Sequence, residues 1–377
     1  MKKIGYFVNT SWFGSRFCKS LANEAALNNY DITFILADDL YVEEFRGNNF
    51  KFIYIPLSRA GINIIEEIAT IIRVRRVLKE LNLDLLHSQT IKPCIYGFLA
   101  SVFTNLKVIN SFTGLGYAFS SNTFKARVAR LLIKLMIRLF SRSNRLSTIV
   151  LNKDDYNFFS KYYKFAEDKL FLVHGSGIDT TIFSPNRMKN KRFGNKILFV
   201  GRLLIDKGIR EFVHACQILE ITHPEIQMLI AGDMDKSNPA SINESQLSIW
   251  EKISNLKFLG RVEDMSSLYN SVDICVLPSY REGLPTAMAE AASCALPLVV
   301  TDVEGCRDVV IDGLTGLVIP VRDSKALATA IIYLCDNPQI STNMGYEGRI
   351  FAKSTFSNKV VNEKILYIYR NVLGSRP

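Results

Sequence analysis

Short, uniformly apolar runs recur along this chain, and each is followed by a longer segment with the residue spacing of a helix. Strands that are apolar at every position are typical of parallel sheets, whose two faces are both covered by helices. The sequence therefore predicts an α/β fold with doubly wound parallel sheets. The predicted strands are Ile4–Val8, Ile32–Ala37, Phe52–Ile55, Leu83–His87, Val108–Ser111, Thr148–Leu151, Leu170–Val173, Lys196–Val200, Gln227–Ala231, Leu256–Leu259, Asp273–Leu277, Pro297–Thr301 and Gly316–Ile319.

The length of the chain indicates more than one domain. A chain of 377 residues exceeds one typical core, and proline, asparagine and glycine interrupt the apolar periodicity at Asp179–Asn195, which predicts a linker. No apolar run reaches the ~18 residues of a membrane span, and no signal-peptide segment precedes the first strand. The seven cysteines form no C-x-x-C pair. We therefore expect a protein of the reducing cytoplasm without disulfides.

The segment Pro278–Glu290 places two carboxylates beside the start of a predicted helix. It follows the apolar run Val272–Leu277, turns through a glycine and a proline, and enters a small-residue helix over Thr286–Cys294. The main-chain N–H groups of a helix start favour phosphate, whereas carboxylates such as Glu282 and Glu290 accept hydrogen bonds from hydroxyl groups. The segment thus indicates a ligand with both phosphate and sugar, such as a nucleotide sugar.

This segment and several others, taken in order, resemble the retaining glycosyltransferases of family four. The matching segments are Val200–Leu203, Lys207-Gly208, Ala231–Asp233, Phe258–Arg261, Thr301-Asp302, Gly305–Arg307 and Asp312–Leu317. The resemblance implies the GT-B fold, in which two Rossmann-like domains face each other across a cleft and a C-terminal helix crosses back. It assigns residues 1–184 to an acceptor-binding domain, 185–357 to a nucleotide-sugar-binding domain, and 358–377 to a helix that packs back on the N-terminal domain.

The resemblance also implies the residues that bind the donor. Arg202 and Lys207 would hold the diphosphate, and Glu282 would contact the donor sugar near its anomeric carbon, which makes these three the predicted catalytic set. Glu290 would accept hydrogen bonds from the ribose. From the sequence we expect Lys207 to begin a helix with Asp206 as its N-cap. The remaining predicted donor contacts are Gly283, Leu284, Pro285, Thr286 and Gly14, the last in a loop over Asn9–Arg16 where an ordinary turn glycine is the alternative.

We expect no cofactor besides the nucleotide-sugar co-substrate, which the resemblance suggests is a UDP-sugar. Asp233-Met234-Asp235 is a D-x-D sequence that in principle could hold a divalent ion. It coincides, however, with the family's Ala-Gly-Asp strand end, and cationic side chains already serve the diphosphate. The sequence therefore predicts no metal site.

The residues that would contact the acceptor are less sharply marked. His87 ends a predicted strand in a sequence similar to a histidine motif of the family, although a histidine there can also be purely structural. Thr113 and Gly114 stand where many family members carry a histidine, so a catalytic histidine is not expected at that place. The surrounding Thr-Gly-Leu-Gly-Tyr sequence is similar to that of bacterial enzymes that build polysaccharide repeat units on lipid carriers.

The positive charge of the chain is concentrated in its first half. Residues 1–184 carry 24 Lys and Arg against 15 Asp and Glu, whereas the remainder is nearly neutral. Within 124–145, cations recur at helical spacing beside an apolar face, a pattern that fits an anionic membrane surface or a core-packed helix with a solvated outer face. No nucleic-acid-binding motif accompanies the charge. The predicted membrane-contact residues are Arg127, Arg130, Lys134, Arg138 and Arg142, and the predicted apolar neighbours are Val128, Leu131, Leu132, Leu135, Met136 and Leu139.

These observations favour a metal-independent, retaining glycosyltransferase that is peripheral on the cytoplasmic face of the membrane. It would move a hexose or N-acetylhexosamine from a UDP-sugar to a lipid-diphosphate-linked saccharide in O-antigen, capsule or related polysaccharide synthesis. The alternative is a sugar-nucleotide epimerase or hydrolase of the same fold, which would need no acceptor. A non-catalytic binding module is disfavoured because Arg202, Lys207, Glu282 and Glu290 are all present.

Overall fold

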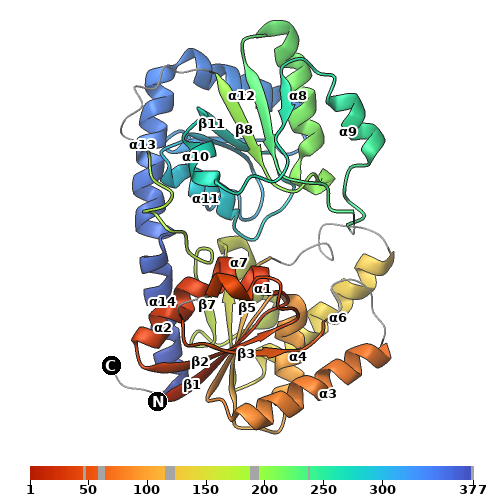
Figure 1. Ribbon diagram of the computed structural model, residues 1–377, viewed down its shortest axis with the longest axis vertical. Coiled ribbons are helices and arrows are strands. Elements are labelled where there is room, and N and C mark those ends of the chain that lie inside the picture. The colour runs from red at the N-terminus through yellow and green to blue at the C-terminus, as the bar shows by residue number, and fades with distance from the viewer. Residues whose placement is uncertain (46–47, 58–63, 115–123, 187–194, 237, 375–377) are drawn as a thin grey trace. The chain divides into compact units, whose positions relative to one another are not determined.

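Figure 1 shows the computed structural model, which describes residues 1–45, 48–57, 64–114, 124–186, 195–236 and 238–374. The chain divides into two compact units. Unit 1 comprises Met1–Gly177 together with Asn358–Pro377, and unit 2 comprises Ile178–Ser357. The last helix therefore belongs to unit 1, although it follows unit 2 in the sequence. Unit 2 begins at Ile178, ahead of the predicted boundary at residue 184.

Unit 1 is built on a seven-stranded parallel sheet in the order β3-β2-β1-β4-β5-β6-β7. The chain starts in the middle at β1, winds outward to β3, and then resumes at β4 on the other side of β1, so the strand order reverses between β1 and β4. The strands are β1 (Lys2–Phe7), β2 (Tyr30–Leu36), β3 (Lys51–Tyr54), β4 (Leu85–Gln89), β5 (Lys107–Phe112), β6 (Leu146–Val150) and β7 (Leu170–Leu172).

Helices cover both faces of this sheet. One face is buried against α3, α4, α6 and α7, which share an apolar core with it, while α14 packs against α2. Among the described residues, no helix is long and apolar enough to cross a membrane. The helical elements are α1 (Ser11–Phe13), the π-helix η1 (Gly14–Cys18), α2 (Lys19–Leu27), the 3₁₀ helix η2 (Val42–Phe45), α3 (Ile64–Leu81), α4 (Ile91–Ser101), α6 (Phe124–Ser141), α7 (Lys153–Tyr163) and α14 (Asn358–Leu373).

A buried polar chain joins α14 to the centre of the sheet. The Tyr369 hydroxyl lies 2.6 Å from Nδ1 of His87 and 3.1 Å from the hydroxyl of Tyr6, and Nε2 of His87 lies 2.7 Å from Oγ of Ser111. All four side chains are buried, so each polar atom depends on its neighbours rather than on water. The last helix is thus held to β1, β4 and β5 by hydrogen bonds as well as by apolar packing.

Unit 2 repeats the architecture with a six-stranded parallel sheet in the order β10-β9-β8-β11-β12-β13. Its strands are β8 (Lys196–Val200), β9 (Gln227–Ala231), β10 (Leu256–Phe258), β11 (Ile274–Leu277), β12 (Leu298–Thr301) and β13 (Gly316–Ile319). Its helical elements are the 3₁₀ helix η3 (Ile205–Lys207), α8 (Ile209–Thr222), α9 (Glu244–Trp250), α10 (Met265–Tyr269), α11 (Thr286–Ser293), α12 (Ser324–Asp336) and α13 (Pro338–Thr355).

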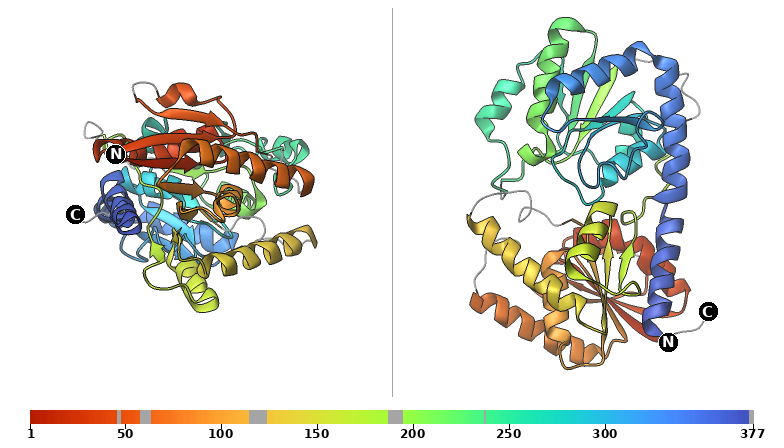
Figure 2. Two further views of the ribbon diagram at one scale, coloured as in Figure 1. Left: turned by 90° about the horizontal axis from the view of Figure 1, so that it is seen from below. Right: turned by 180° about the vertical axis from the view of Figure 1, so that it is seen from behind.

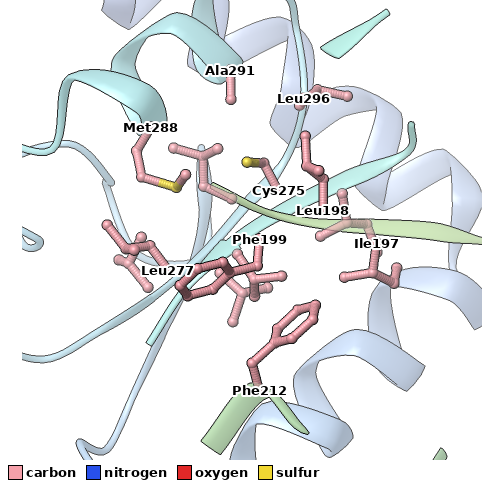
Figure 3. Close-up of a cluster of buried hydrophobic side chains, with 14 of the residues drawn as sticks. Ile197, Leu198, Phe199, Phe212, Cys275, Leu277, Met288, Ala291 and Leu296 are labelled. Atoms are coloured by element: carbon pink, nitrogen blue, oxygen red, sulfur yellow. The ribbon is translucent and has the colours of Figure 1, made fainter. Parts of the chain in front are cut away.

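The core of unit 2 lies on both sides of its central strands. Figure 3 shows Phe199 of β8 beside Phe212 of α8, with ring centroids 5.4 Å apart, and Met288 of α11 near the other central strand β11. Because β8 and β11 are buried on both faces, they hold the loops that follow them in fixed positions.

The predicted fold class is confirmed, since both units are parallel α/β sheets with helices on both faces. Each of the predicted strands is present, with ends that differ by at most two residues. Strand ends are the least well-determined part of a sequence-based assignment because the hydrogen-bond ladder, and not the apolar run, decides where a strand stops.

His87 gives unit 1 a defined response to acid. Burial lowers the pKa of His87 to about 3, whereas an unfolded histidine titrates near 6.5, so the unfolded chain binds one more proton between these values. Stability should therefore fall as the pH drops below about 6.5, by about 1.4 kcal/mol per pH unit for this one group. His174, whose pKa burial lowers to about 4, should contribute in the same direction.

The His87 contribution is measurable by urea unfolding at pH 7, 6, 5 and 4.5. We expect His87→Gln, which keeps a hydrogen-bonding side chain, to be less stable at pH 7. Its unfolding free energy should depend less on pH than that of the wild type, by the slope that one bound proton contributes. His174→Gln serves as the comparison for a half-buried histidine. Equal slopes for the wild type and His87→Gln would contradict the buried, neutral state of His87.

Candidate functional site

The candidate site lies where the strand order of the unit 2 sheet reverses. Strands β8 and β11 are neighbours, but the chain leaves β8 toward β9 on one side and leaves β11 toward β12 on the other. Loops that diverge in this way leave a crevice at the carboxyl ends of the two strands, which is the usual ligand site of doubly wound sheets. Arg202 follows β8, and the segment Pro278–Pro285 follows β11.

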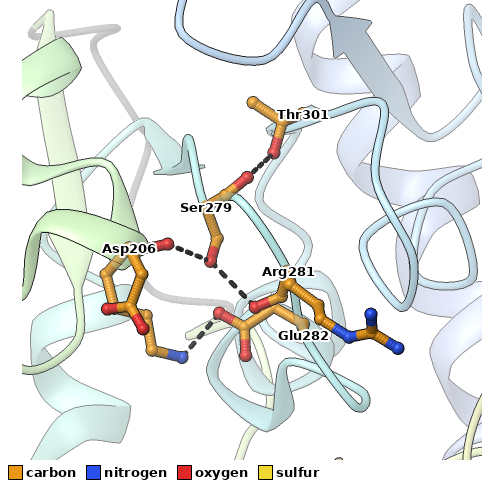
Figure 4. Close-up of polar contacts among 6 residues, drawn as sticks. Asp206, Ser279, Arg281, Glu282 and Thr301 are labelled. Carbon is orange, nitrogen blue, oxygen red and sulfur yellow. Dashed lines mark hydrogen bonds and ion pairs between the residues drawn. The ribbon is translucent and has the colours of Figure 1, made fainter. Parts of the chain in front are cut away.

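Lys207 and Glu282 meet at this crevice. Nζ of Lys207 donates to Oε1 of Glu282 at 2.5 Å, and both side chains are mostly buried (Figure 4). The prediction that Lys207 begins a helix is wrong, because it ends the 3₁₀ helix η3 and α8 begins only at Ile209. Between them Gly208 has a φ of +75°, a left-handed conformation that interrupts the helix. Asp206 is therefore not the N-cap.

Main-chain contacts fix the loop that carries Glu282. The carbonyl oxygen of Asp206 accepts from the backbone N–H of Tyr280 at 2.8 Å and from Oγ of Ser279 at 3.0 Å. The hydroxyl of Thr301 donates to the carbonyl oxygen of Ser279, and the N–H of Glu282 donates to the carbonyl oxygen of Glu304 at 3.1 Å. The loop is thus tied to η3 on one side and to the segment after β12 on the other (Figure 4).

Arg202 has a carboxylate partner of its own. Its Nη1 donates to Oδ2 of Asp235 at 2.6 Å, and the arginine side chain remains more than half exposed. Asp235 belongs to the D-x-D sequence that follows β9, so one of its two carboxylates is already engaged by a cation. Among the described residues, no group of three or more His, Cys, Asp or Glu side chains is arranged to hold a metal ion.

Glu290 lies deeper than Glu282. It sits in α11, is only 5% exposed, and its Oε2 accepts from the hydroxyl of Tyr269 at 3.3 Å. The same hydroxyl lies 3.1 Å from the carbonyl oxygen of Ala287, one turn earlier in the helix. Burial, reinforced by the nearby carboxylate, raises the pKa of Tyr269 well above its usual value, so this phenol stays protonated and can donate.

The start of α11 is suited to an anion. The helix begins at Thr286 with Pro285 as its N-cap, and no side chain caps it. Gly283 and Pro285 are buried, whereas Leu284 and Thr286 are half-buried and border the same loop. An uncapped helix start offers main-chain N–H groups and the positive end of the helix dipole to a negatively charged group.

Two of the predicted contact residues in unit 1, Gly14 and His87, are buried. The loop predicted over Asn9–Arg16 is wrong, because α1 and η1 make the segment helical. Gly14 lies in η1, where a Cβ would make only ordinary contacts of 3.4 Å with Leu36 and Phe45, so it is not the turn glycine of a loop. His87 is fully buried with both ring nitrogens occupied, which leaves no exposed atom for an acceptor.

Thr113 and Gly114 follow β5 and are half-buried at the carboxyl edge of the unit 1 sheet. The rest of the Thr-Gly-Leu-Gly-Tyr sequence, from residue 115 onward, lies outside the described residues. Unlike His87, which is buried within β4, they occupy the sheet edge at which ligands bind in doubly wound folds.

The sequence did not predict a cluster that supports the Glu282 loop from behind. The hydroxyl of Tyr280 donates to Oε1 of Glu211 at 2.7 Å, and the guanidinium of Arg322 lies 4.7 Å from the Tyr280 ring centroid. Burial and the neighbouring Glu211 carboxylate raise the pKa of Tyr280 to about 12. These residues come from three distant segments, so no local pattern could have revealed the cluster.

Comparison with known proteins agrees with this geometry. The family model "Glycosyl transferases group 1" matches residues 183–351, and the model "Glycosyl transferase 4-like" matches residues 3–149. Two Rossmann-like parallel-sheet units in one chain, with these matches, define a protein of the GT-B class. The chain belongs to these glycosyltransferases, whose two models between them cover most of its length.

Individual relatives point the same way. The chain is 26% identical over 356 residues to the N,N'-diacetylbacillosaminyl-diphospho-undecaprenol alpha-1,3-N-acetylgalactosaminyltransferase of Campylobacter jejuni, covering 91% of this chain and 92% of the relative. It is 24% identical to the UDP-Gal:alpha-D-GlcNAc-diphosphoundecaprenol alpha-1,3-galactosyltransferase of Escherichia coli, covering 88% and 85%. Its fold is similar to that of HepE from Anabaena in complex with UDP and glucose, with a TM-score of 0.79 at 15% identity over the full length of both chains.

Gly208 offers a direct test of how the site is built. A Cβ at this position would lie 1.9 Å from the carbonyl oxygen of Pro278, whereas a Cβ at Gly313, which has a similar φ of +73°, would meet nothing within 4 Å. Gly313→Ala should lower the free energy of unfolding by only about 1 kcal/mol, which is the intrinsic penalty of the left-handed conformation for alanine. Gly208→Ala should lose more than about 2 kcal/mol because the backbone must also shift.

Chemical denaturation of the two variants measures this difference. The two glycines share their backbone conformation. Any loss of unfolding free energy in Gly208→Ala beyond that in Gly313→Ala therefore reports the contact with Pro278. If both alanine variants lose the same stability, η3 does not press against the start of the Glu282 loop as described.

Proposed function

We propose that this glycosyltransferase moves a sugar from a UDP-sugar to a lipid-diphosphate-linked saccharide with retention of anomeric configuration. The observation that carries the proposal is the placement of Lys207, Glu282 and the uncapped start of α11 after the carboxyl ends of the neighbouring strands β8 and β11 of unit 2. A cation and a helix start suit a diphosphate, and a carboxylate suits sugar hydroxyls.

On this proposal, Arg202 and Lys207 bind the donor diphosphate. Charge-assisted hydrogen bonds of this kind contribute roughly 1.5–3 kcal/mol each. Main-chain groups of Gly283, Leu284, Pro285 and Thr286 would border the phosphates and the sugar. Because the two cations neutralise the charge that develops on the leaving diphosphate, we propose that no metal ion is needed and that EDTA leaves activity unchanged.

The transfer step exchanges one bond for another at the anomeric carbon. The bond from this carbon to the phosphate oxygen of the donor breaks, a bond to the acceptor hydroxyl oxygen forms, and the hydroxyl proton leaves with the diphosphate. Charge on the sugar ring is positive in the transition state, so the carboxylate of Glu282 can stabilise it. Glu290, which is buried in α11, would hold the ribose of the nucleotide.

The acceptor class is inferred from the relatives. The Campylobacter jejuni and Escherichia coli enzymes are named for saccharides on diphospho-undecaprenol. We propose an acceptor of the same chemical class, a saccharide linked through diphosphate to a lipid, with synthesis of a surface polysaccharide such as O-antigen or capsule as the setting. Thr113 and Gly114 are the residues of unit 1 that we assign to it.

A transfer assay separates this proposal from an epimerase or hydrolase of the same fold. The protein is incubated with a panel of UDP-sugars, with and without an extract that contains lipid-linked saccharides. The proposal predicts that UDP release requires the extract and that the labelled sugar moves into the lipid fraction. Equal UDP release or sugar rearrangement without the extract would instead identify the hydrolase or epimerase.

Replacement of Glu282 and of Glu290 should affect different kinetic constants. Glu290→Ala should chiefly raise the KM for the donor, because a ribose contact is similar in the ground and transition states. Glu282→Ala should chiefly lower kcat, because its contact lies near the reacting carbon. Steady-state kinetics with a saturating acceptor measures both constants. Two variants with the wild-type kcat would contradict the division of roles.

The exposure of α6 supports contact with the membrane. The helix packs on unit 1 through Ile133, Ile137 and Phe140, which are buried. Of the predicted apolar face only Met136 packs there, whereas Leu131 is 69% and Leu135 54% exposed. Lys134 and Arg138 lie beside these leucines on the same helix, Arg142 follows directly after its last residue, and all three cations are exposed. An exposed leucine row next to a row of cations suits the interface of an anionic bilayer.

We therefore propose that α6 binds the protein to anionic lipid. Vesicles that contain phosphatidylglycerol should bind it at low salt and release part of it as salt rises, since lipid charge is screened within about 10 Å at 0.1 M. Replacing Lys134, Arg138 and Arg142 with glutamate should abolish binding but leave UDP binding unchanged. The matched control replaces three exposed lysines of unit 2, Lys252, Lys257 and Lys353, with the same change of charge. Co-sedimentation of the first variant at the wild-type level would rule out the assignment.

A further inference from the structure

Helix α3 exposes a second row of aliphatic side chains that the proposed function does not use. Ile65, Ile68 and Ile72 are 79%, 53% and 47% exposed, at spacings of three and four residues that place them on one face. The opposite side of α3 is an ordinary core face, with Val74 and Leu78 buried against the sheet. Three exposed isoleucines on one helix face are far more than packing requires.

This row lies in the same helical layer as the exposed leucines of α6. Helix α4 lies between the two, packs on α3, and contacts α6 through the rings of Phe98 and Phe140, whose centroids are 4.8 Å apart. No residue of α4 is exposed, whereas α3 and α6, which flank it, both carry exposed residues. Figures 1 and 2 show that the N-terminal ends of α3 and α6 project from the same side of unit 1.

The projecting ends of α3 and α6 lie near the edge of the unit 1 sheet that we assign to the acceptor. A crossover helix in a parallel sheet starts from the carboxyl end of a strand, and this is the edge that carries Thr113 and Gly114. Ile65 and Ile68 lie in the first turns of α3, and Leu131 and Leu132 lie in the first half of α6. The exposed isoleucines of α3 therefore lie toward this edge, and the exposed leucines of α6 run from the first half of that helix into its second half.

The chemistry of the α3 row favours lipid over a protein partner. The row is followed by the exposed cations Arg76 and Lys79, and Arg73 adjoins it. No aromatic residue belongs to α3, although aromatic side chains are enriched in protein–protein interfaces and lysines are depleted there. Of the two acidic residues in its first turn, Glu67 is paired with Lys92 of α4 at 2.7 Å. Aliphatic residues that lead into cations suit acyl chains beneath anionic headgroups.

We propose that α3 is a second membrane-contacting element and that unit 1 rests on an anionic bilayer through two parallel ridges, α3 and α6. The inference rests on the proposed membrane contact of α6 and extends it. A single interfacial helix leaves a protein free to rock about the helix axis, whereas two ridges with α4 between them define a plane. The two contacts together fix the orientation of the Thr113–Gly114 edge relative to the lipid that carries the acceptor.

The test places a tryptophan on each ridge of the full-length protein. Ile68→Trp on α3 and Leu135→Trp on α6 are compared with Ile221→Trp, which replaces an 84% exposed isoleucine of unit 2. Emission is recorded as a difference from the wild type, which carries Trp12 and Trp250. On adding phosphatidylglycerol vesicles, both ridge variants should shift to shorter wavelength and be quenched by brominated acyl chains. The unit 2 control should not respond.

A second variant measures affinity. Replacing Ile65, Ile68 and Ile72 with serine should weaken vesicle binding about tenfold or more, through the loss of buried aliphatic area, and should leave UDP binding unchanged. Because these side chains are exposed, the thermal midpoint should barely move, so failure to fold does not explain a loss.

The outcomes distinguish the role of α3 from the membrane contact proposed for α6. A response from Leu135→Trp without one from Ile68→Trp overturns the role of α3 but leaves α6 intact. No response from either tryptophan overturns both. A wild-type dimer that the serine variant converts to monomer in sedimentation velocity, with no change in vesicle binding, would show that α3 contacts a second copy of the chain.

Discussion

The candidate site depends on one close approach in unit 2, between the turn after β8 and the loop after β11. Gly208 makes it possible, because its left-handed conformation ends η3 and a side chain there would collide with Pro278. The approach brings Lys207 against Glu282 and lets the carbonyl oxygen of Asp206 accept two hydrogen bonds from the Glu282 loop. The sheet supplies the two strand ends, and this contact sets the spacing of the functional groups that they carry.

Both cations of the site are paired with carboxylates, Lys207 with Glu282 and Arg202 with Asp235. The Arg202–Asp235 pair is partly exposed and contributes little to stability, because water screens it and the side chains lose entropy, whereas the Lys207–Glu282 pair is mostly buried. Each pair fixes its cation beside a carboxylate, at 2.6 Å for Arg202 and 2.5 Å for Lys207. On the proposed function, a diphosphate would draw both cations away from their carboxylates, which would free Glu282 for the sugar as the donor binds.

Local patterns in the sequence were sufficient for the fold and for the position of the site, but not for its pairings. Apolar runs such as Lys196–Val200 predict buried strands because a parallel strand is covered on both faces, and the residues that follow a strand must then lie at the ligand edge. The pairing of Arg202 with Asp235, and the Tyr280–Glu211–Arg322 cluster, join segments far apart in the chain. The loop predicted over Asn9–Arg16 was wrong because a helical segment begins at Ser11, soon after β1 ends at Phe7. The leucines of α6 were predicted to share one apolar face, but the sequence did not show that Ile133 and Ile137, rather than those leucines, face the core.

The central claim is that Arg202 and Lys207 bind the donor diphosphate, and UDP binding by isothermal titration calorimetry tests it most directly. Arg202→Ala and Lys207→Ala should each weaken UDP binding by about tenfold or more, given the charge-assisted bonds that are lost. Arg210→Ala, which removes an exposed arginine from the first turn of α8, soon after Lys207 in the sequence, is the matched control and should bind UDP as the wild type does. Wild-type affinity in an Arg202→Ala, Lys207→Ala double variant would contradict the account.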